Sequence, residues 1–518
     1  MKRLCAFAVC WVFASAVLCH AQSPHLAAGA AYFRQGDFDH ALIEFREAQA
    51  ESPRDATIMN LIGITETKLG KIDEANAEYR QSIVADPNLL APHKNLAVNY
   101  LASARYSDAE DQLKQALKLN STDPFLHAYL ASLYIATSRD EEAVQQLDLA
   151  GSLIESDPTL LYGMAMACLR LHQDEKALHL IATGEQKSFF NIEQEYQLAL
   201  LLTGHKNFVE ATERFRQIVK AAPDSWSAKE DLAISLLNGN QQQQAIPVLE
   251  ELVRERSADS NAWALLGSAY ELSGNNEKSL DAYRAAVTAD PENPDRYLDY
   301  ARLLMDLDRY GEATQIIQAG IGHTADPYAL NIRKGSIQML QGKCAEARVT
   351  FQNAIQQHPE ISLGYYALAQ CDLKDGRAQE AEAVLKDALA KSPGDAKIDF
   401  LYGVVLSQLG KKDQAIDAMK RSIARDSHVA ESHYQLGMLL EEDGQLQQAK
   451  NEFEQAIGFA PSHANAFYQL SKIYGRLGDK ASAEKMAHRT QELLAQARAN
   501  ALEQQKTMLS DLKSPSQQ

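Results

Sequence analysis

Residues Ser260 to Asn293 read SNAWALLGSAYELSGNNEKSLDAYRAAVTADPEN, and this pattern recurs along most of the chain. Two helix-forming segments are separated by polar residues around Gly274 and are closed by Pro291. Glycine and proline both favour the end of a helix, so each such stretch predicts a pair of short helices joined by a tight turn.

The spacing of small residues shows how the pairs are arranged. Steps of 34 residues from Ala41 to Ala483 land on alanine each time except at Ser279, and the same steps from Gly29 to Ser471 meet only glycine, alanine or serine. Two helices can cross closely where their side chains are smallest. A constant period of about 20–50 residues is typical of a solenoid, so the sequence predicts an all-α solenoid of fourteen helical hairpins.

The repeat resembles the tetratricopeptide repeat family. In residues 260–293 the positions that carry the resemblance hold Trp263, Leu266, Gly267, Tyr270, Gly274, Tyr283, Ala286 and Pro291. The resemblance implies a right-handed superhelix that binds proteins. Units of 34 residues starting at residue 22 cover residues 22–497, and we expect irregular structure near residues 151–158, 184–190 and 320–327, where glycine weakens the second helix.

The first residues have the features of a secretory signal. Lys2 and Arg3 form a basic start, residues 4–18 are apolar apart from Ser15, and Ala21 is a small residue at the predicted cleavage point. We therefore expect residues 1–21 to be removed on export, leaving a periplasmic or extracellular chain with no stable membrane insertion. An uncleaved anchor is the alternative, but the apolar run is shorter than the roughly 20 residues that a spanning helix needs.

The charge of the chain argues against nucleic-acid binding. There are 51 basic and 69 acidic residues, for a formal net charge of −18, and loss of Lys2 and Arg3 would make it −20. Phosphate recognition relies on clustered basic residues, whereas here both signs are interspersed. The excess of acid predicts a well-solvated surface, although an acidic groove would also favour basic partners.

Motifs for catalysis, metal binding or a cofactor were not found. The sequence has no G-x-S-x-G, no H-E-x-x-H and no pair of C-x-x-C motifs. Only residues 498–518 remain beyond the repeats, and we expect them to extend the last helix as a cap before a disordered tail. The sequence therefore predicts no catalytic residue, no metal site and no cofactor.

Three cysteines remain after removal of the predicted signal: Cys168, Cys344 and Cys371. An odd, sparse set does not form a disulfide framework. Cys344 and Cys371 fall on neighbouring antiparallel helices, so a bridge between them is one interpretation for an oxidising compartment. In the other interpretation Cys371 is simply a small core residue.

The candidate binding residues come from the resemblance, which implies that positions 2, 5, 9, 12 and 13 of each first helix line a concave groove. Position 5 is aromatic in the last four repeats, and charges of both signs surround these rings. Aromatic anchors with a charged surround are typical of peptide-binding surfaces, but the rings could also merely pack on their neighbours. The predicted groove residues are Tyr366, Lys374, Phe400, Tyr434, Glu441, Glu442, Tyr468, Lys472 and Arg476.

These observations predict a non-catalytic scaffold of the cell envelope that binds a protein or peptide in its groove. One alternative is a component of an envelope complex that assembles or exports polysaccharide or protein. A second alternative is an enzyme, for which the repeats leave little room.

Overall fold

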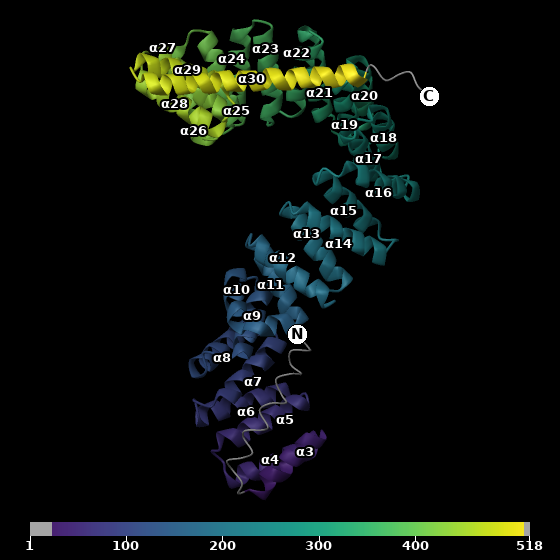
Figure 1. Ribbon diagram of the computed structural model, residues 1–518, viewed down its shortest axis with the longest axis vertical. Coiled ribbons are helices and arrows are strands. Elements are labelled where there is room, and N and C mark those ends of the chain that lie inside the picture. Colours follow the sequence, from purple (N-terminus) through teal and green to yellow (C-terminus); the bar gives the residue numbers. More distant parts are fainter. Residues whose placement is uncertain (1–22, 512–518) are drawn as a thin grey trace. The chain divides into compact units, whose positions relative to one another are not determined.

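The computed structural model describes the backbone of residues 23–511 and the side chains of residues 23–500. Within this range the chain forms twenty-eight α-helices, one short 3-10 helix and no strand. Its contacts divide it into two units, one ending at Leu252 and the other beginning at Val253. In each unit successive helices pack as hairpins stacked in chain order (Figure 1). The predicted signal, residues 1–21, lies outside the described residues.

The helices alternate between a first and a second member of each hairpin. The first helices are α3 (Pro24–Gln35), α5 (Ala56–Lys68), α7 (Leu90–Ala102), α9 (Pro124–Ala136), α11 (Pro158–Arg170), α13 (Ile192–Gly204), α15 (Trp226–Asn238), α17 (Ser260–Leu272), α19 (Pro294–Asp306), α21 (Tyr328–Leu340), α23 (Ser362–Lys374), α25 (Ala396–Gln408), α27 (Ala430–Glu442) and α29 (Ala464–Arg476). The second helices are α4 (Phe38–Glu51), α6 (Ile72–Ala85), α8 (Tyr106–Leu119), α10 (Asp140–Ala150), α12 (Asp174–Gln186), α14 (Phe208–Ala221), α16 (Gln242–Glu255), α18 (Asn276–Ala289), α20 (Tyr310–His323), α22 (Cys344–Gln357), α24 (Ala378–Lys391), α26 (Lys412–Arg425), α28 (Leu446–Phe459) and α30 (Lys480–Asp511).

Local sequence signals decide where these helices begin and end. Asp55 and Asp259, for example, accept backbone N–H groups of α5 and α17 as N-caps. Between the two helices of every hairpin, one residue has a positive φ. That residue is glycine in eight hairpins, as at Gly274 (φ 79°), because glycine adopts this left-handed conformation without a steric penalty. The other six positions hold Ala104, Ser138, His172, Lys206, Asn240 and Asp308.

The small-residue columns lie where the two helices of each hairpin meet. Ala245 and Ala415, which serve as tests of the register, are both 0% exposed. The predicted hairpin register is therefore confirmed at these positions.

At each hairpin crossing, the size of the core residue is related to the size of the small residue opposite it. Gly63, Gly267 and Gly335 each face an aromatic ring, and an added Cβ would lie 2.6, 2.7 and 2.3 Å from the rings of Tyr79, Tyr283 and Phe351. Where the core residue is leucine or isoleucine, the small residue is alanine. Ala199 opposite Phe215 is an exception. A ring and a methyl group therefore compete for one space at most crossings.

A polar ring at the fourth position of many repeats links each hairpin to the turn before it. In six repeats a ring nitrogen or hydroxyl oxygen of this side chain lies 2.9 to 3.3 Å from the backbone carbonyl oxygen six residues earlier. This contact satisfies a turn carbonyl that the helices leave unpaired. The six residues are His93, His127, Trp263, Tyr297, Tyr365 and His433.

The structure shows two of the three predicted irregularities. The helix α10 ends at Ala150, and a 3-10 helix, η1 (Gly151–Ser156), replaces its last turn. The ring of Phe190 covers Gly184, whose added Cβ would lie 2.1 Å from Phe190 Cζ. The expectation near Gly320 is wrong for the helix itself, because α20 continues through Gly320 to His323 with the usual fourteen residues. Tyr297 and Leu330 pack against Gly320, which explains why a glycine is tolerated there.

We expect these two irregular segments to exchange their amide hydrogens faster than the rest of the array. A 3-10 turn and a truncated helix have weaker or fewer backbone hydrogen bonds than a full α-helix. Hydrogen exchange followed by mass spectrometry should show lower protection in residues 151–157 and 184–191 than in α17 and α18. Equal protection in all four segments would contradict this expectation.

The final helix continues beyond the length of an ordinary second helix. α30 ends at Asp511, whereas the second helices before it have at most fourteen residues. Leu493 is 9% exposed and Leu494 is 46% exposed, so the helix is packed on one side only at this level. The capping role of residues 498–518 stays a prediction.

Candidate partner-binding face

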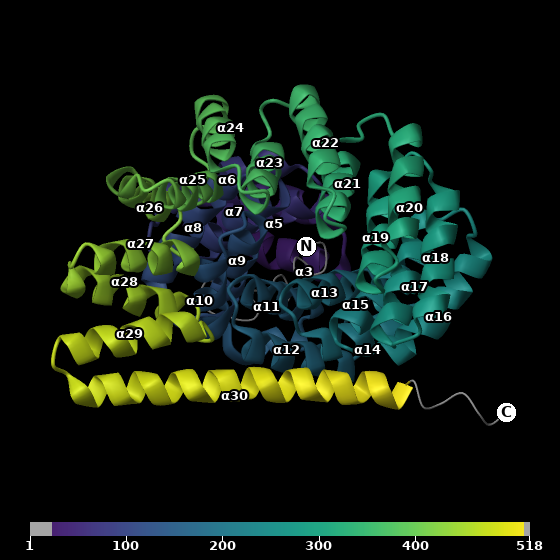
Figure 2. The same cartoon turned by 90° about the horizontal axis from the view of Figure 1, so that it is seen from above.

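The predicted groove residues lie on the first helices of the last four hairpins. In the unit that begins at Val253, Figure 2 shows an arc with α19, α21, α23 and α25 on its inner side and α20, α22, α24 and α26 on its outer side. We use the term inner face for the surface of α23, α25, α27 and α29 that carries the nine predicted residues. The aromatic residues of this face are Tyr366, Phe400, Tyr434 and Tyr468.

Three of these four rings are partly buried. Tyr366, Phe400 and Tyr434 pack against the hydrophobic core of the unit, whereas Tyr468 is 53% exposed. Tyr468 differs because it belongs to the last hairpin, so no further first helix of the described chain packs beside it. The most accessible anchor is therefore Tyr468.

Tyr434 shows how the next hairpin covers such a ring. Its centroid lies 4.7 Å from the ring of His463 and 5.9 Å from the ring of Phe453. Burial raises the pKa of Tyr434, and a hydrogen bond with Gln469 acts in the opposite direction. Tyr434 therefore contributes to packing whether or not it also binds a partner.

Charged groups from two helices surround Tyr468. Lys472 Nζ lies 5.8 Å from the centroid of the Tyr468 ring and donates a hydrogen bond to Gln469 Oε1 at 2.9 Å. Glu441 Oε1 accepts a hydrogen bond from Arg476 Nη1 at 2.9 Å and lies 3.6 Å from Lys472 Nζ. The structure therefore brings together Glu441, Tyr468, Lys472 and Arg476 on α27 and α29.

The remaining predicted charges are more dispersed. Lys374 donates to the backbone carbonyl of Met339 at 2.9 Å, which ties α23 to α21. Glu442 is exposed at the end of α27. A contact that the sequence reasoning missed is Glu431 Oε2 with His463 Nε2 at 3.1 Å. It joins α27 to the N-cap residue of α29.

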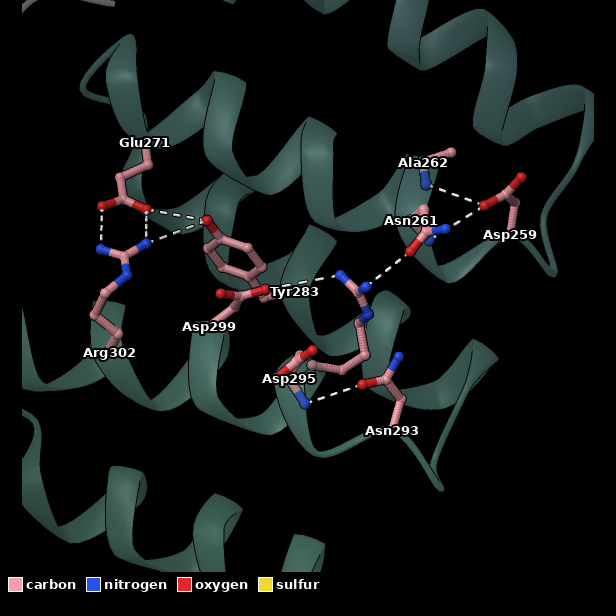
Figure 3. A network of polar contacts seen from close by, with 10 residues as sticks. Asp259, Asn261, Ala262, Glu271, Tyr283, Asn293, Asp295, Asp299 and Arg302 are labelled. Atoms are coloured by element: carbon pink, nitrogen blue, oxygen red, sulfur yellow. Dashed lines mark hydrogen bonds and ion pairs between the residues drawn. The ribbon is translucent and has the colours of Figure 1, made fainter. Parts of the chain in front are cut away.

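The sequence reasoning also missed an ion pair on groove positions of earlier hairpins. Arg302 of α19 donates two hydrogen bonds of 2.7 Å to the carboxylate of Glu271 on α17 (Figure 3). Tyr283 OH donates to the same carboxylate at 3.1 Å. The hydrogen bond from Arg302 lowers the pKa of Glu271. Reading positions 9 and 12 along every repeat, rather than only around the aromatic residues, would have found this pair.

The two cysteines of the proposed bridge are close together and unbridged. Both are free thiols, and Cys371 Sγ lies 3.4 Å from the carbonyl oxygen of Cys344. Burial raises the pKa of the Cys371 thiol to about 11, which keeps the thiol protonated at neutral pH. These features suit a small core residue, and a disulfide stays a prediction.

In residues 23–500 no group of three or more histidine, cysteine, aspartate or glutamate side chains is placed to hold a metal ion. The helices described up to Asp511 include none that is both long enough and apolar enough to span a membrane.

Human protein O-mannosyl-transferase TMTC1 is 25% identical to this chain over 177 residues, which are 33% of this chain and 20% of that protein. Most of that protein therefore lies outside the match. Among solved structures, MamA is 21% identical with a TM-score of 0.30 and covers 32% of this chain and 96% of its own. Yeast Tom70 is 14% identical with a TM-score of 0.41 and covers 82% of this chain and 99% of its own.

Several family models match segments of the chain. Models described as tetratricopeptide repeats match residues 26–89, 94–158, 196–260, 231–294, 332–396, 272–334, 372–436 and 430–463. Arrays of such repeats expose extended binding surfaces and serve as protein-interaction scaffolds. Because the matched segments together cover most of its length, the chain belongs to the tetratricopeptide repeat family.

Proposed function

We propose that this protein is an interaction scaffold whose inner face, on α23, α25, α27 and α29, binds a segment of a partner protein. The observation that carries the proposal is the half-exposed ring of Tyr468 beside Lys472, Glu441 and Arg476. Binding hot spots combine an aromatic or arginine side chain with a surround that excludes water. Tyr468 and Arg476 supply both residue types on one helix.

The charges of this face indicate what the partner segment offers. Glu441 is shared between Lys472 and Arg476, so these three side chains have a net charge of +1. An approaching carboxylate would gain a charge-assisted hydrogen bond there, and an aromatic or aliphatic group would cover Tyr468. The best-fitting partner segment therefore has an apolar side chain next to an acidic one.

We further propose that the scaffold acts in the periplasm or outside the cell after loss of residues 1–21. Support comes from the basic start, the short apolar run and Ala21. Expression of the full chain in a bacterial host followed by cell fractionation and N-terminal sequencing tests this. We expect a mature chain that begins at Gln22 in the exported fraction, and an uncleaved chain in the cytoplasm would contradict it.

The inner face is tested by replacing its most exposed ring. Tyr468→Ala is expected to weaken partner binding by about 2 kcal/mol, because a hot-spot aromatic loses its contact area. Its effect on stability should stay within about 0.5 kcal/mol, since the ring is 53% exposed. The partner is first captured from envelope extract with the mature protein, and calorimetry with the purified partner then gives the two affinities.

A matched control separates binding from packing. Trp226→Ala removes a ring of similar exposure, 46%, from another hairpin and should leave the affinity unchanged. Tyr434→Ala should lower the melting temperature as well, because its ring contacts Phe453 and His463. Unchanged affinity in the Tyr468 variant would show that the inner face is not the binding surface. Capture of a whole membrane complex would assign the protein to an envelope assembly.

A further inference from the structure

A surface groove lies at the second hairpin, formed by α5 and α6, in the unit that does not contain the inner face. It encloses about 740 Å³. Met59, Ala77 and Val84 line it with apolar groups, and Arg54 and Arg80 line it with guanidinium groups. Val84 is 82% exposed although it is a large apolar side chain. Its side chain is therefore accessible to a partner.

The groove is open because of the residue at the fourth position of its repeat. In six other repeats this position holds histidine, tyrosine or tryptophan, whose ring reaches back to the preceding turn. Met59 has no donor for that carbonyl and leaves the space between the turn and α6 unfilled. This hairpin therefore lacks the ring contact that those six hairpins have.

The charge of the groove is opposite to that of the chain. No carboxylate lines it. Arg80 donates to the neutral hydroxyl of Tyr100 at 3.2 Å. Most other arginines of the described chain face a carboxylate, as Arg302 faces Glu271. Two guanidinium groups beside apolar groups, in a chain of net charge −18, attract a ligand that is both acidic and apolar.

We propose that this groove is a second docking site of the scaffold and binds an acidic segment of a partner protein with aliphatic side chains between its carboxylates. The aliphatic groups lie on Met59, Ala77 and Val84, and the carboxylates pair with Arg54 and Arg80. Guanidinium groups bind carboxylates with two parallel hydrogen bonds, which gives the site direction as well as charge. The docking requires no contribution from the inner face.

The test uses the mature protein and two fluorescein-labelled peptides. In the first peptide leucine alternates with aspartate and glutamate, and in the second asparagine and glutamine replace the acids. Fluorescence anisotropy should show that the acidic peptide binds at least about tenfold more tightly, and that added salt removes this difference. Equal affinities, or no saturable binding of the acidic peptide, would overturn the proposal.

Three variants locate the site. Arg54→Gln with Arg80→Gln removes the charges, and Met59→Tyr fills the groove as Tyr297 and Tyr365 do in their repeats. The double arginine variant and Met59→Tyr should each weaken binding of the acidic peptide about tenfold. Arg284→Gln is the control, because Arg284 also bonds a tyrosine hydroxyl but is already paired with Asp281 at 2.8 Å. Its affinity should match that of the wild type, and circular dichroism should show all variants folded.

Two further outcomes would overturn the proposal. If the charge variant keeps its affinity, the peptide binds elsewhere. If the peptide fails to bind but analytical ultracentrifugation shows a dimer that the charge variant loses, the occupant is a second copy of the chain. Tyr468→Ala should leave the acidic peptide's affinity at this groove unchanged, which distinguishes failure of this proposal from failure of the inner face.

Discussion

Replacing Asp399 with lysine is expected to destabilise the array by about 3–5 kcal/mol, the cost of leaving a buried charge without a partner. The Asp399 side chain is 0% exposed and lies 2.9 Å from Arg421 Nε and 2.5 Å from Arg425 Nη1. A lysine there would face two guanidinium groups inside the protein. Urea denaturation followed by circular dichroism measures the loss, and hydrogen exchange of α25 and α26 locates it.

Another repeat of the same chain has an equivalent ion pair with its charges exchanged, which suggests a second substitution that restores stability. At the equivalent position Lys229, 3% exposed, pairs with Glu251 at 2.9 Å. Adding Arg421→Glu to Asp399→Lys recreates that arrangement, so we expect about half of the lost stability to return while Arg425 stays as a nearby like charge. If the double variant is no more stable than Asp399→Lys alone, the ion pair is not what holds this position.

Replacing Phe351 with alanine is expected to cost about 3–5 kcal/mol, because a fully buried ring leaves a cavity that the helices cannot close. Phe351 is 0% exposed and packs in a cluster with Ala367, Leu368 and Cys371. The same urea experiment measures the change. A loss below about 1 kcal/mol would mean that the hairpin collapses around the space.

Gly335 lies opposite Phe351, so substitutions at the two positions should have coupled effects on stability. Gly335→Ala alone should destabilise by about 1–3 kcal/mol, since the new Cβ would lie 2.3 Å from the ring. In a Phe351→Leu background the same change should stabilise, because alanine is the better helix former by about 1 kcal/mol and the crossing then resembles the chain's own alanine and leucine hairpins. The same sign in both backgrounds would refute the coupling.

The helix boundaries were predictable because the signals for them are local. An N-cap at Asp259, a left-handed glycine at Gly274 and a proline at Pro291 act on their own neighbours in sequence. Gly320 was misjudged for the same reason. Its helix propensity is low, but Tyr297 and Leu330 pack into the space that a side chain would occupy, and tertiary packing outweighs propensity.

The candidate sites were only partly predictable. The aromatic residues at position 5 are visible in the sequence, but Tyr434 and Tyr468 look alike there. The structure separates them, because the next hairpin covers Tyr434 with His463 while Tyr468 has no following first helix among the described residues. The groove at Met59 had no sequence signal of its own, since a methionine differs from a ring only when the surrounding turn and helix are in place.

The sequence by itself determined that this protein is an all-helical repeat array with 34-residue hairpins, because small residues, caps and turn residues recur in one phase and each acts over a few residues. Only the tertiary structure decided which of the chemically equivalent repeat positions are open to a partner and which core residues exclude one another. Exposure and steric fit depend on what the neighbouring hairpins place against a side chain, and two repeats with the same residue at one position have different neighbours.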